Sequence, residues 1–209
     1  KATAGIHYIF HVAACFREAK ALESEYHDVH VKSTQLLAEA AISQAEFKRF
    51  IHVSTMGVHG HIENPPGNEE SPYAPGDIYQ VTKLGGELWL REFASKTKLA
   101  YTIIRPCAIY GPGDKRLFKI FRMATYPIFP ILGKGKCLYH LIHVDDLADA
   151  MILAAVHPAA VGEAFLVGNP EAIKLEDLAK HVTKELEKKT LSLRIPVAPF
   201  FILADLCEA

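Results

Sequence analysis

Short apolar runs alternate with amphipathic segments along the first half of the chain. Residues 6–14 (IHYIFHVAA), 49–55 (RFIHVST) and 100–106 (AYTIIRP) have the length and the β-branched and aromatic content of buried strands. Residues 31–45, and the segment from Tyr79 onward, place apolar residues at helical spacing. This alternation predicts a parallel sheet with helices on both faces.

The pattern changes after Gly111. A turn (GPGD) is followed by the patterns of helices at 117–125, 143–156 and 174–189, and of strands at 163–168 and 191–196. We interpret the chain as an α/β protein. Residues 1–110 are expected to form a Rossmann-like, doubly wound domain, and residues 111–209 mainly a smaller α/β substrate lobe, with elements returning to the first domain. In open α/β sheets, ligands bind at the carboxyl ends of the strands.

Composition excludes several classes of partner. The 209 residues carry 23 Lys and Arg against 24 Asp and Glu, a net charge of -1, so no electrostatic case exists for nucleic acid or an anionic membrane. The most apolar stretch, Ile195 to Leu206, is too short for a membrane span and contains Pro196 and Pro199. Four cysteines without C-x-x-C spacing suit free thiols in a reducing, cytoplasmic environment.

Histidines are frequent but do not predict a metal site. The chain has 11 of them, so close pairs are expected by chance. The groups at 59–63 (HGHIE) and 27–30 (HDVH) lack helical H-x-x-x-H spacing and a cysteine partner. We therefore expect no metal.

Tyr79 and Lys83 are the first candidates for chemistry. They stand four residues apart at the start of a predicted helix, so their side chains project from the same side. Bringing a tyrosine pKa from about 10 to about 7 takes roughly 4 kcal/mol of preferential stabilisation of the phenolate, and a nearby cation supplies that sign. Thr55 ends the preceding strand, one loop away. The three residues together predict general acid–base chemistry at an alcohol or ketone.

Six motifs, in order along the chain, carry a family resemblance. They are FHVAA (10–14), VHVKST (29–34), FIHVSTMGVHG (50–60), YQVTK (79–83), IIRPCAIYGPGD (103–114) and LIHVDDLADA (141–150). In this order and spacing the chain resembles an extended short-chain dehydrogenase/reductase of the NAD-dependent epimerase/dehydratase family.

The resemblance implies a role for each matching position. Tyr79 matches the catalytic acid/base, Lys83 the lysine that lowers the tyrosine pKa and holds the nicotinamide ribose, and Thr55 the hydroxyl that positions the reacting oxygen, with Ser54 as the alternative. The implied cofactor is NAD or NADP. With Tyr79 and Lys83, the residues expected to line it are His11, Ala13, Ala14, Ser54, Pro106, Cys107, Ala108 and Ile109. The residues expected to contact substrate are Met56, Gly57, His59 and Tyr139.

One departure from the family pattern concerns the start of the chain. The family opens with a strand and a Gly-x-x-Gly-x-x-Gly turn that seats the pyrophosphate, and these 209 residues contain no such turn. We therefore expect an N-terminally incomplete chain, lacking the first three strands. The strand at 6–13 would then present an unpaired apolar edge, so the chain alone should be poorly soluble or fail to bind NAD(H).

The substrate stays open at this point. Nucleotide-sugar members often carry an asparagine and an arginine where this chain has Ala108 or Ile109, and Tyr139. We expect an oxidoreductase acting on a small sugar-like substrate. The alternatives are a 3β-hydroxysteroid dehydrogenase-like or other ketone reductase, and a catalytically silent dinucleotide-binding scaffold or inactive fragment. The resemblance also implies a homodimer through the helices beginning near His30 and Tyr79.

Overall fold

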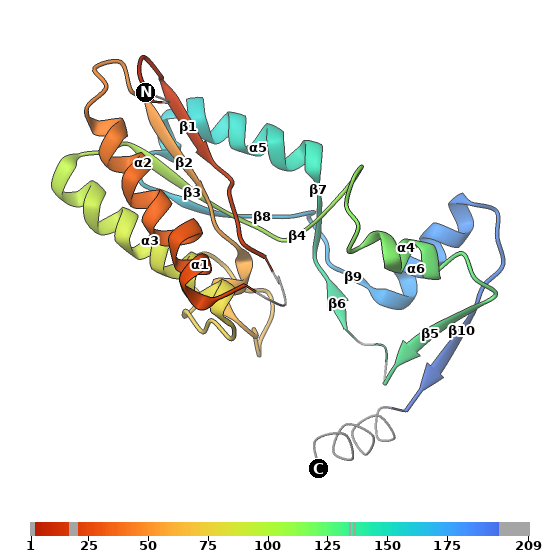
Figure 1. Cartoon of the computed structure of the whole chain (residues 1–209). Helices are drawn as coiled ribbons and strands as arrows, with labels where there is room; N and C mark the ends of the chain where they lie inside the picture. The colour runs from red at the N-terminus through yellow and green to blue at the C-terminus, as the bar shows by residue number, and fades with distance from the viewer. Residues whose placement is uncertain (1–2, 17–20, 134, 136, 197–209) are drawn as a thin grey trace, which may run out of the picture. The chain divides into compact units, whose positions relative to one another are not determined.

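The computed structural model describes residues 3–16, 21–133, 135 and 137–196 (Figure 1). The chain divides into two compact units. The first comprises residues 1–107 and 145–167, and the second residues 108–144 and 168–209. The apolar stretch that begins at Ile195 lies outside the described residues from position 197 onward.

The first unit contains a four-stranded sheet. Its strands, in spatial order, are β1 (Tyr8–His11), β2 (Arg49–Val53), β3 (Tyr101–Pro106) and β8 (Ala164–Val167). All three neighbouring pairs are parallel, with Tyr8 opposite Arg49 and Phe50 opposite Tyr101. Every residue of β2 is buried, as a central parallel strand requires. The parallel α/β fold predicted from the sequence is confirmed.

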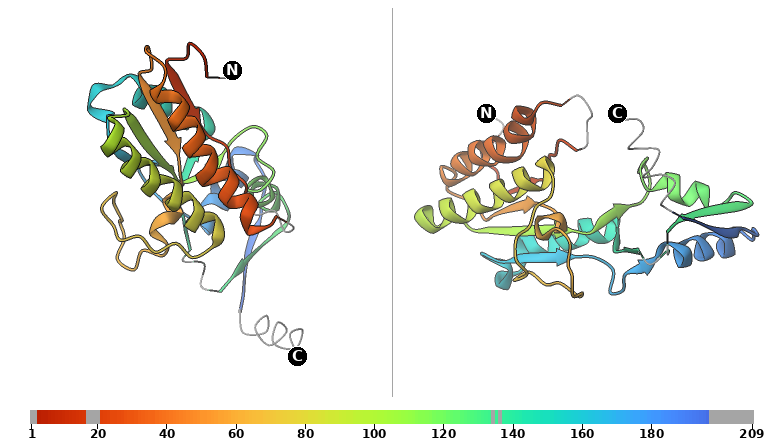
Figure 2. Two further views of the ribbon diagram at one scale, coloured as in Figure 1. Left: turned by 60° about the vertical axis from the view of Figure 1, so that its left-hand side comes forward. Right: turned by 90° about the horizontal axis from the view of Figure 1, so that it is seen from below.

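Helices cover both faces of this sheet (Figure 2). One face carries α1 (Glu23–His27), the π-helical turn η1 (Asp28–Lys32), α2 (Ser33–Ile42) and α3 (Ile78–Thr97); the other carries α5 (Val144–Val156), followed by the short η3 (Pro158–Ala160). Between the sheet and α2 and α3, a core contains Ala38, Phe50 and Leu90, each 0% exposed. On the opposite face, Arg49 of β2 donates from Nη1 to the Ala154 carbonyl of α5 at 2.9 Å. The result is a three-layer unit.

Capping residues mark both ends of α3. The Asp77 carboxylate accepts a hydrogen bond from the Gln80 N–H at 2.8 Å and caps the first turn. Lys98, in the left-handed region at φ 61°, ends the helix. The short 3-10 helix η2 (Met56–His59) follows β2, capped by the Thr55 side chain. Thr55 therefore lies just after the end of β2, and Tyr79 is the second residue of α3.

The second unit is built from short pairs of strands. They are β4 (Ala108–Tyr110) parallel to β7 (Leu141–His143), β5 (Ile128–Leu132) parallel to β10 (Leu191–Ile195), and β6 (Leu138–Tyr139) antiparallel to β9 (Ile173–Lys174). Its helices are α4 (Phe118–Met123) and α6 (Leu175–Glu185). They pack over a small core that includes Phe129, Ile131 and Ala179. Within the described ranges, no helix has both the length and the apolarity needed to cross a membrane.

Candidate active site

Lys83 lies at the carboxyl ends of β1 and β2. Its side chain is buried, and its Nζ donates hydrogen bonds to the Val53 carbonyl at 2.9 Å and to the Ala13 carbonyl at 3.1 Å. Burial lowers the pKa of Lys83 from its usual 10.5 to about 8, while the Glu87 carboxylate acts in the opposite direction. The ammonium is thus held at the sheet edge by main-chain oxygens.

Tyr79 faces the same segment as Lys83. Its partly exposed ring makes edge-on contacts with Phe16, at 4.8 Å between centroids, and with His30, at 5.3 Å. Phe16 follows Ala13 in the stretch after β1, so the two side chains of α3 are directed at one loop. Residues four apart on a helix project from the same side, so both side chains belong to one side of α3.

The two candidate hydroxyls differ in access. Thr55 is partly exposed, and its Oγ1 accepts a hydrogen bond from the Gly57 N–H at 3.1 Å. The Ser54 hydroxyl is buried and has no hydrogen-bond partner among the described residues. Thr55 is thus the more accessible of the two residues.

Three buried histidines surround the lysine. Burial, reinforced by the nearby Lys83 charge, lowers the pKa of His11 to about 4 and that of His30 to about 3. The same causes hold the pKa of His52 well below its usual 6.5. The His11 and His52 rings are 5.6 Å apart. All three rings are neutral at physiological pH, so Lys83 is the cation of this cluster.

The other residues expected to line the cofactor lie after β1 and at β3 and β4. Ala13 and Ala14 are exposed, and Pro106 and Cys107 are buried. Burial raises the pKa of the Cys107 thiol to about 11, so it stays protonated at neutral pH. Ala108 and Ile109 form β4 in the second unit, where they are partly exposed.

The residues expected to contact substrate have different environments. Met56 and Gly57 are partly exposed in η2, and a Cβ on Gly57 would lie 3.0 Å from the Gln80 side chain. Tyr139 belongs to β6 in the second unit, and burial raises its phenol pKa. His59 is 4% exposed; its Nε2 lies 3.0 Å from Nη1 of Arg105, and its Nδ1 lies 2.8 Å from the Ser71 carbonyl. Its ring nitrogens are therefore engaged within the protein.

Sequence reasoning missed the network around Arg105. This side chain is 0% exposed, and Nη2 donates to Glu87 at 2.7 Å and to the Tyr73 hydroxyl at 2.8 Å. Nη1 donates to the Glu69 carbonyl at 3.1 Å. One signal was available: Glu87 stands four residues after Lys83 and therefore on the same side of α3.

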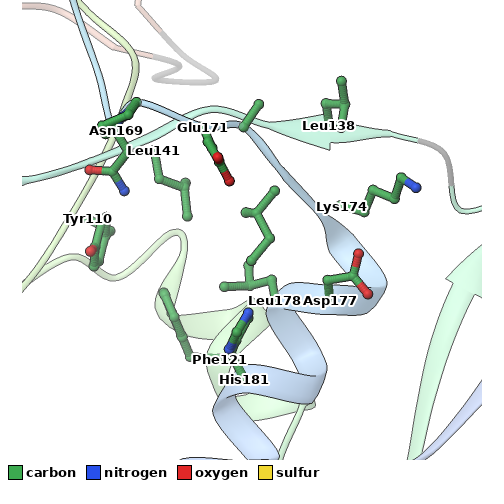
Figure 3. A pocket seen from close by; sticks show the side chains of 13 residues that line it. Tyr110, Phe121, Leu138, Leu141, Asn169, Glu171, Lys174, Asp177, Leu178 and His181 are labelled. Atoms are coloured by element: carbon green, nitrogen blue, oxygen red, sulfur yellow. The ribbon is translucent and has the colours of Figure 1, made fainter.

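The second unit contains a cavity of about 790 Å³ (Figure 3). Its apolar lining comes mainly from Phe121, Leu138, Leu141 and Leu178. The charged side chains along it are Glu171, Lys174 and Asp177. Asp177 forms an ion pair with Lys180 at 3.0 Å. Among the described residues that line it there is no arginine.

Comparison with known proteins places the chain in a family. The model of the NAD dependent epimerase/dehydratase family matches residues 1–168. UDP-glucose 4-epimerase of Vibrio cholerae is 29% identical over 176 residues, which cover 82% of this chain and 53% of the relative. The 3beta-hydroxysteroid-dehydrogenase/decarboxylase isoform 2 of Arabidopsis thaliana is 29% identical over 223 residues, which cover 100% of this chain and 39% of the relative. The chain thus spans about half the length, or less, of these relatives.

Solved structures agree with this assignment. UDP-glucose 4-epimerase of Thermotoga maritima, solved with UDP-glucose, superposes with a TM-score of 0.77 at 25% identity, over 91% of this chain and 64% of that structure. UDP-glucuronic acid 4-epimerase of Bacillus cereus, solved with NAD, superposes with a TM-score of 0.78 at 24% identity, over 92% and 63%, and shows the shared fold. Together with the family-model match, the motifs in the sequence identify the chain as a member of the NAD-dependent epimerase/dehydratase family.

Proposed function

We propose that this chain forms part of an NAD(P)-dependent oxidoreductase in which Tyr79 is the acid/base, Lys83 keeps that tyrosine acidic and Thr55 positions the reacting oxygen. The observation that carries the proposal is the buried ammonium of Lys83, held by the Ala13 and Val53 carbonyls at the sheet edge that Tyr79 also faces. A cation in this position favours the phenolate over the phenol.

The residues fit the nicotinamide end of a dinucleotide. Exposed Ala13 and Ala14 leave room beside the strand ends, and the Lys83 ammonium is a donor suited to ribose hydroxyls. When bound, the cofactor supplies hydride transfer, and the protein supplies orientation and proton traffic.

Tyr79 and Thr55 would act on one proton, that of the substrate hydroxyl. During oxidation of a secondary alcohol, the Tyr79 phenolate accepts the hydroxyl proton while Thr55 donates a hydrogen bond to the same oxygen. During reduction of a ketone, the Tyr79 phenol returns that proton. Lys83 stays charged throughout, so the phenolate is stabilised each time it forms.

The substrate we propose first is sugar-like, as it is for the epimerase relatives. These include UDP-glucose 4-epimerase of Vibrio cholerae and the structure of a UDP-glucose 4-epimerase with UDP-glucose. The proposed reaction is hydride transfer at a secondary alcohol or ketone of the sugar ring. Such a reaction is shared by epimerisation and dehydration, which differ in the steps that follow.

A second candidate is a neutral ketone or secondary alcohol, as for the hydroxysteroid relatives. The sequence favours it, because nucleotide-sugar members often carry an asparagine and an arginine where this chain has Ala108 or Ile109, and Tyr139. A dianionic diphosphate prefers an arginine fork and amide donors. Competition between UDP-glucose and a steroid ketone in one assay ranks the two substrate classes.

The acid–base role is tested by Tyr79→Phe in the full-length protein. We expect kcat to fall by about 10²- to 10⁴-fold with the Kd for NAD(H) nearly unchanged, because only proton transfer is lost. Tyr26→Phe is the matched control, since Tyr26 also contacts the His30 ring, at 5.9 Å, from α1. Turnover of Tyr79→Phe within about threefold of the unaltered protein would refute the role.

A further inference from the structure

His30 links the helix of Tyr79 to the loop that follows β1. Its ring is buried between them, with Nδ1 at 2.8 Å from Thr82 Oγ1 of α3 and Nε2 at 3.0 Å from the Cys15 main-chain nitrogen. The ring also makes a T-shaped contact with the Tyr79 ring. The acid–base chemistry proposed for Tyr79, Lys83 and Thr55 does not use this side chain.

The hydrogen bonds select one protonation state of His30. A main-chain N–H can only donate, so Nε2 accepts from Cys15 and carries no proton. The single proton of the neutral ring then lies on Nδ1. The Thr82 hydroxyl donates to the Ile78 carbonyl at 2.7 Å and is therefore free to accept from Nδ1–H. A doubly protonated ring would place two N–H groups against each other at Cys15.

A π-helical turn brings the ring to this place. His30 is the central residue of η1, and π turns inside α-helices are frequent at functional sites. The main-chain oxygen of His30 accepts a hydrogen bond from the Thr34 hydroxyl at 2.7 Å. It also faces Gly86 of α3, where an added Cβ would lie 2.7 Å away. Close approach of the two helices at Gly86 thus lets the ring reach Thr82.

We propose that His30, in its neutral form with the proton on Nδ1, is a positioning residue. It holds the Ala13–Cys15 loop against α3, the helix that carries Tyr79 and Lys83. The proposal rests on the proposed function, because it assigns cofactor binding to that loop and proton transfer to that helix. Lys83 joins the same two segments through its bond to the Ala13 carbonyl. The loop bond acts on cofactor affinity, and the Thr82 bond, one residue before Lys83, acts on turnover.

Two conservative variants of the full-length protein separate the two bonds. In His30→Asn the amide nitrogen takes the place of Nδ1, which keeps the bond to Thr82 and loses that to Cys15. In His30→Gln the amide oxygen takes the place of Nε2, which keeps the Cys15 bond and loses the other. We expect His30→Asn to raise the Kd for NAD(H) about tenfold with kcat little changed, and His30→Gln to lower kcat about tenfold with that Kd little changed.

Hydrogen exchange gives a readout that does not depend on turnover. The Cys15 amide should exchange faster in His30→Asn than in His30→Gln, and ring ¹⁵N shifts of the unaltered protein should show an unprotonated Nε2. Thr34→Val, which removes a buried bond to the same residue's main chain, controls for general loosening of the helix. Should the two variants match each other in Kd, kcat and Cys15 exchange, the proposal is overturned. If Tyr79→Phe retains turnover, the proposed function fails, and Cys15 exchange still decides the role of His30.

Discussion

Two buried cations beside α3, Lys83 and Arg105, are stabilised in opposite ways. Lys83 is 2% exposed and bonds two main-chain carbonyls, whereas Arg105 is 0% exposed and bonds the Glu87 carboxylate. Burial lowers the pKa of Lys83 to about 8. Burial also opposes the charge of Arg105, but its hydrogen bonds and ion pair with Glu87 outweigh burial and raise the Arg105 pKa.

The difference suits the two cations to different roles, Arg105 to stabilising the fold and Lys83 to the proposed chemistry. Arg105 also donates to Tyr73, to the Glu69 carbonyl and to His59, so its charge anchors residues that precede α3. The Arg105 guanidinium therefore stays protonated at any ordinary pH. Among the described residues, the Lys83 ammonium has main-chain carbonyls and no carboxylate as hydrogen-bond partners. Its pKa of about 8 keeps it charged at neutral pH, which suits the proposed role of stabilising the Tyr79 phenolate.

Arg105→Met should lower the free energy of unfolding by about 3–5 kcal/mol, because it leaves the Glu87 carboxylate buried without its cation. Lys83→Met is the matched control and should change that free energy by about 1 kcal/mol or less, since no buried carboxylate depends on it. Urea denaturation of both variants measures the difference. Adding Glu87→Leu to Arg105→Met should restore most of the loss. Equal losses for the two single variants would contradict the contrast.

Acid should destabilise the histidine cluster around Lys83. The folded pKa values of His11 (about 4) and His30 (about 3), and that of His52, lie below the unfolded value of 6.5. The unfolded chain therefore binds protons first, so stability is complete above pH 6.5 and falls as the pH drops toward 4 and then 3. We expect a loss of about 1 kcal/mol for each histidine at pH 5.5, measured by urea denaturation against pH 7.5.

His52 provides the control for this pH dependence. Neither of its ring nitrogens has a hydrogen-bond partner among the described residues, and the ring is 0% exposed. His52→Phe keeps a ring of similar size and removes the titrating group. The variant should lose about a third of the stability change between pH 7.5 and 5.5. A pH dependence identical to that of the unaltered protein would exclude this histidine as a source.

Gly86→Ala tests the close approach that seats the cluster. Its Cβ would lie 2.7 Å from the His30 carbonyl, so we expect a loss of about 1–3 kcal/mol in unfolding free energy. Gly85→Ala, one position earlier on α3, meets only Val31 Cγ2 at 3.4 Å. Because alanine favours helix, that change should be neutral or stabilising by up to about 1 kcal/mol. Thermal unfolding of the pair decides, and a Gly86→Ala protein as stable as Gly85→Ala would remove the steric argument.

Lys180→Ala should have the smallest effect. Its ion pairs with Glu176 and Asp177 lie on the surface of α6, with the lysine side chain 63% exposed. Exposed pairs of this kind contribute little to stability, because water and salt screen the charges. A thermal shift comparable to that of Arg105→Met would show that burial does not govern the value of ion pairs here.

Much of the proposed site could be predicted from the sequence, because its arrangement depends on local spacing. The four-residue interval places Tyr79 and Lys83 on one side of α3, and the strand ending before Thr55 places that hydroxyl at the sheet edge. The partners of Lys83 were not readable, since the Ala13 and Val53 carbonyls belong to the main chain and carry no residue signature. The short strands β6 and β9, of two residues each, have too little pattern to be predicted.

The sequence alone determined the alternation of strands and helices, the family, and the three residues proposed for catalysis, because hydrophobic periodicity and motif spacing are properties of neighbouring residues. Tertiary structure decided which buried cation is paired with a carboxylate and which is not. It also decided the single tautomer of His30 and gave both ring nitrogens of His59 partners within the protein. These outcomes depend on contacts between segments far apart in the sequence, since burial and distance, rather than residue type, set the charge state of a buried group.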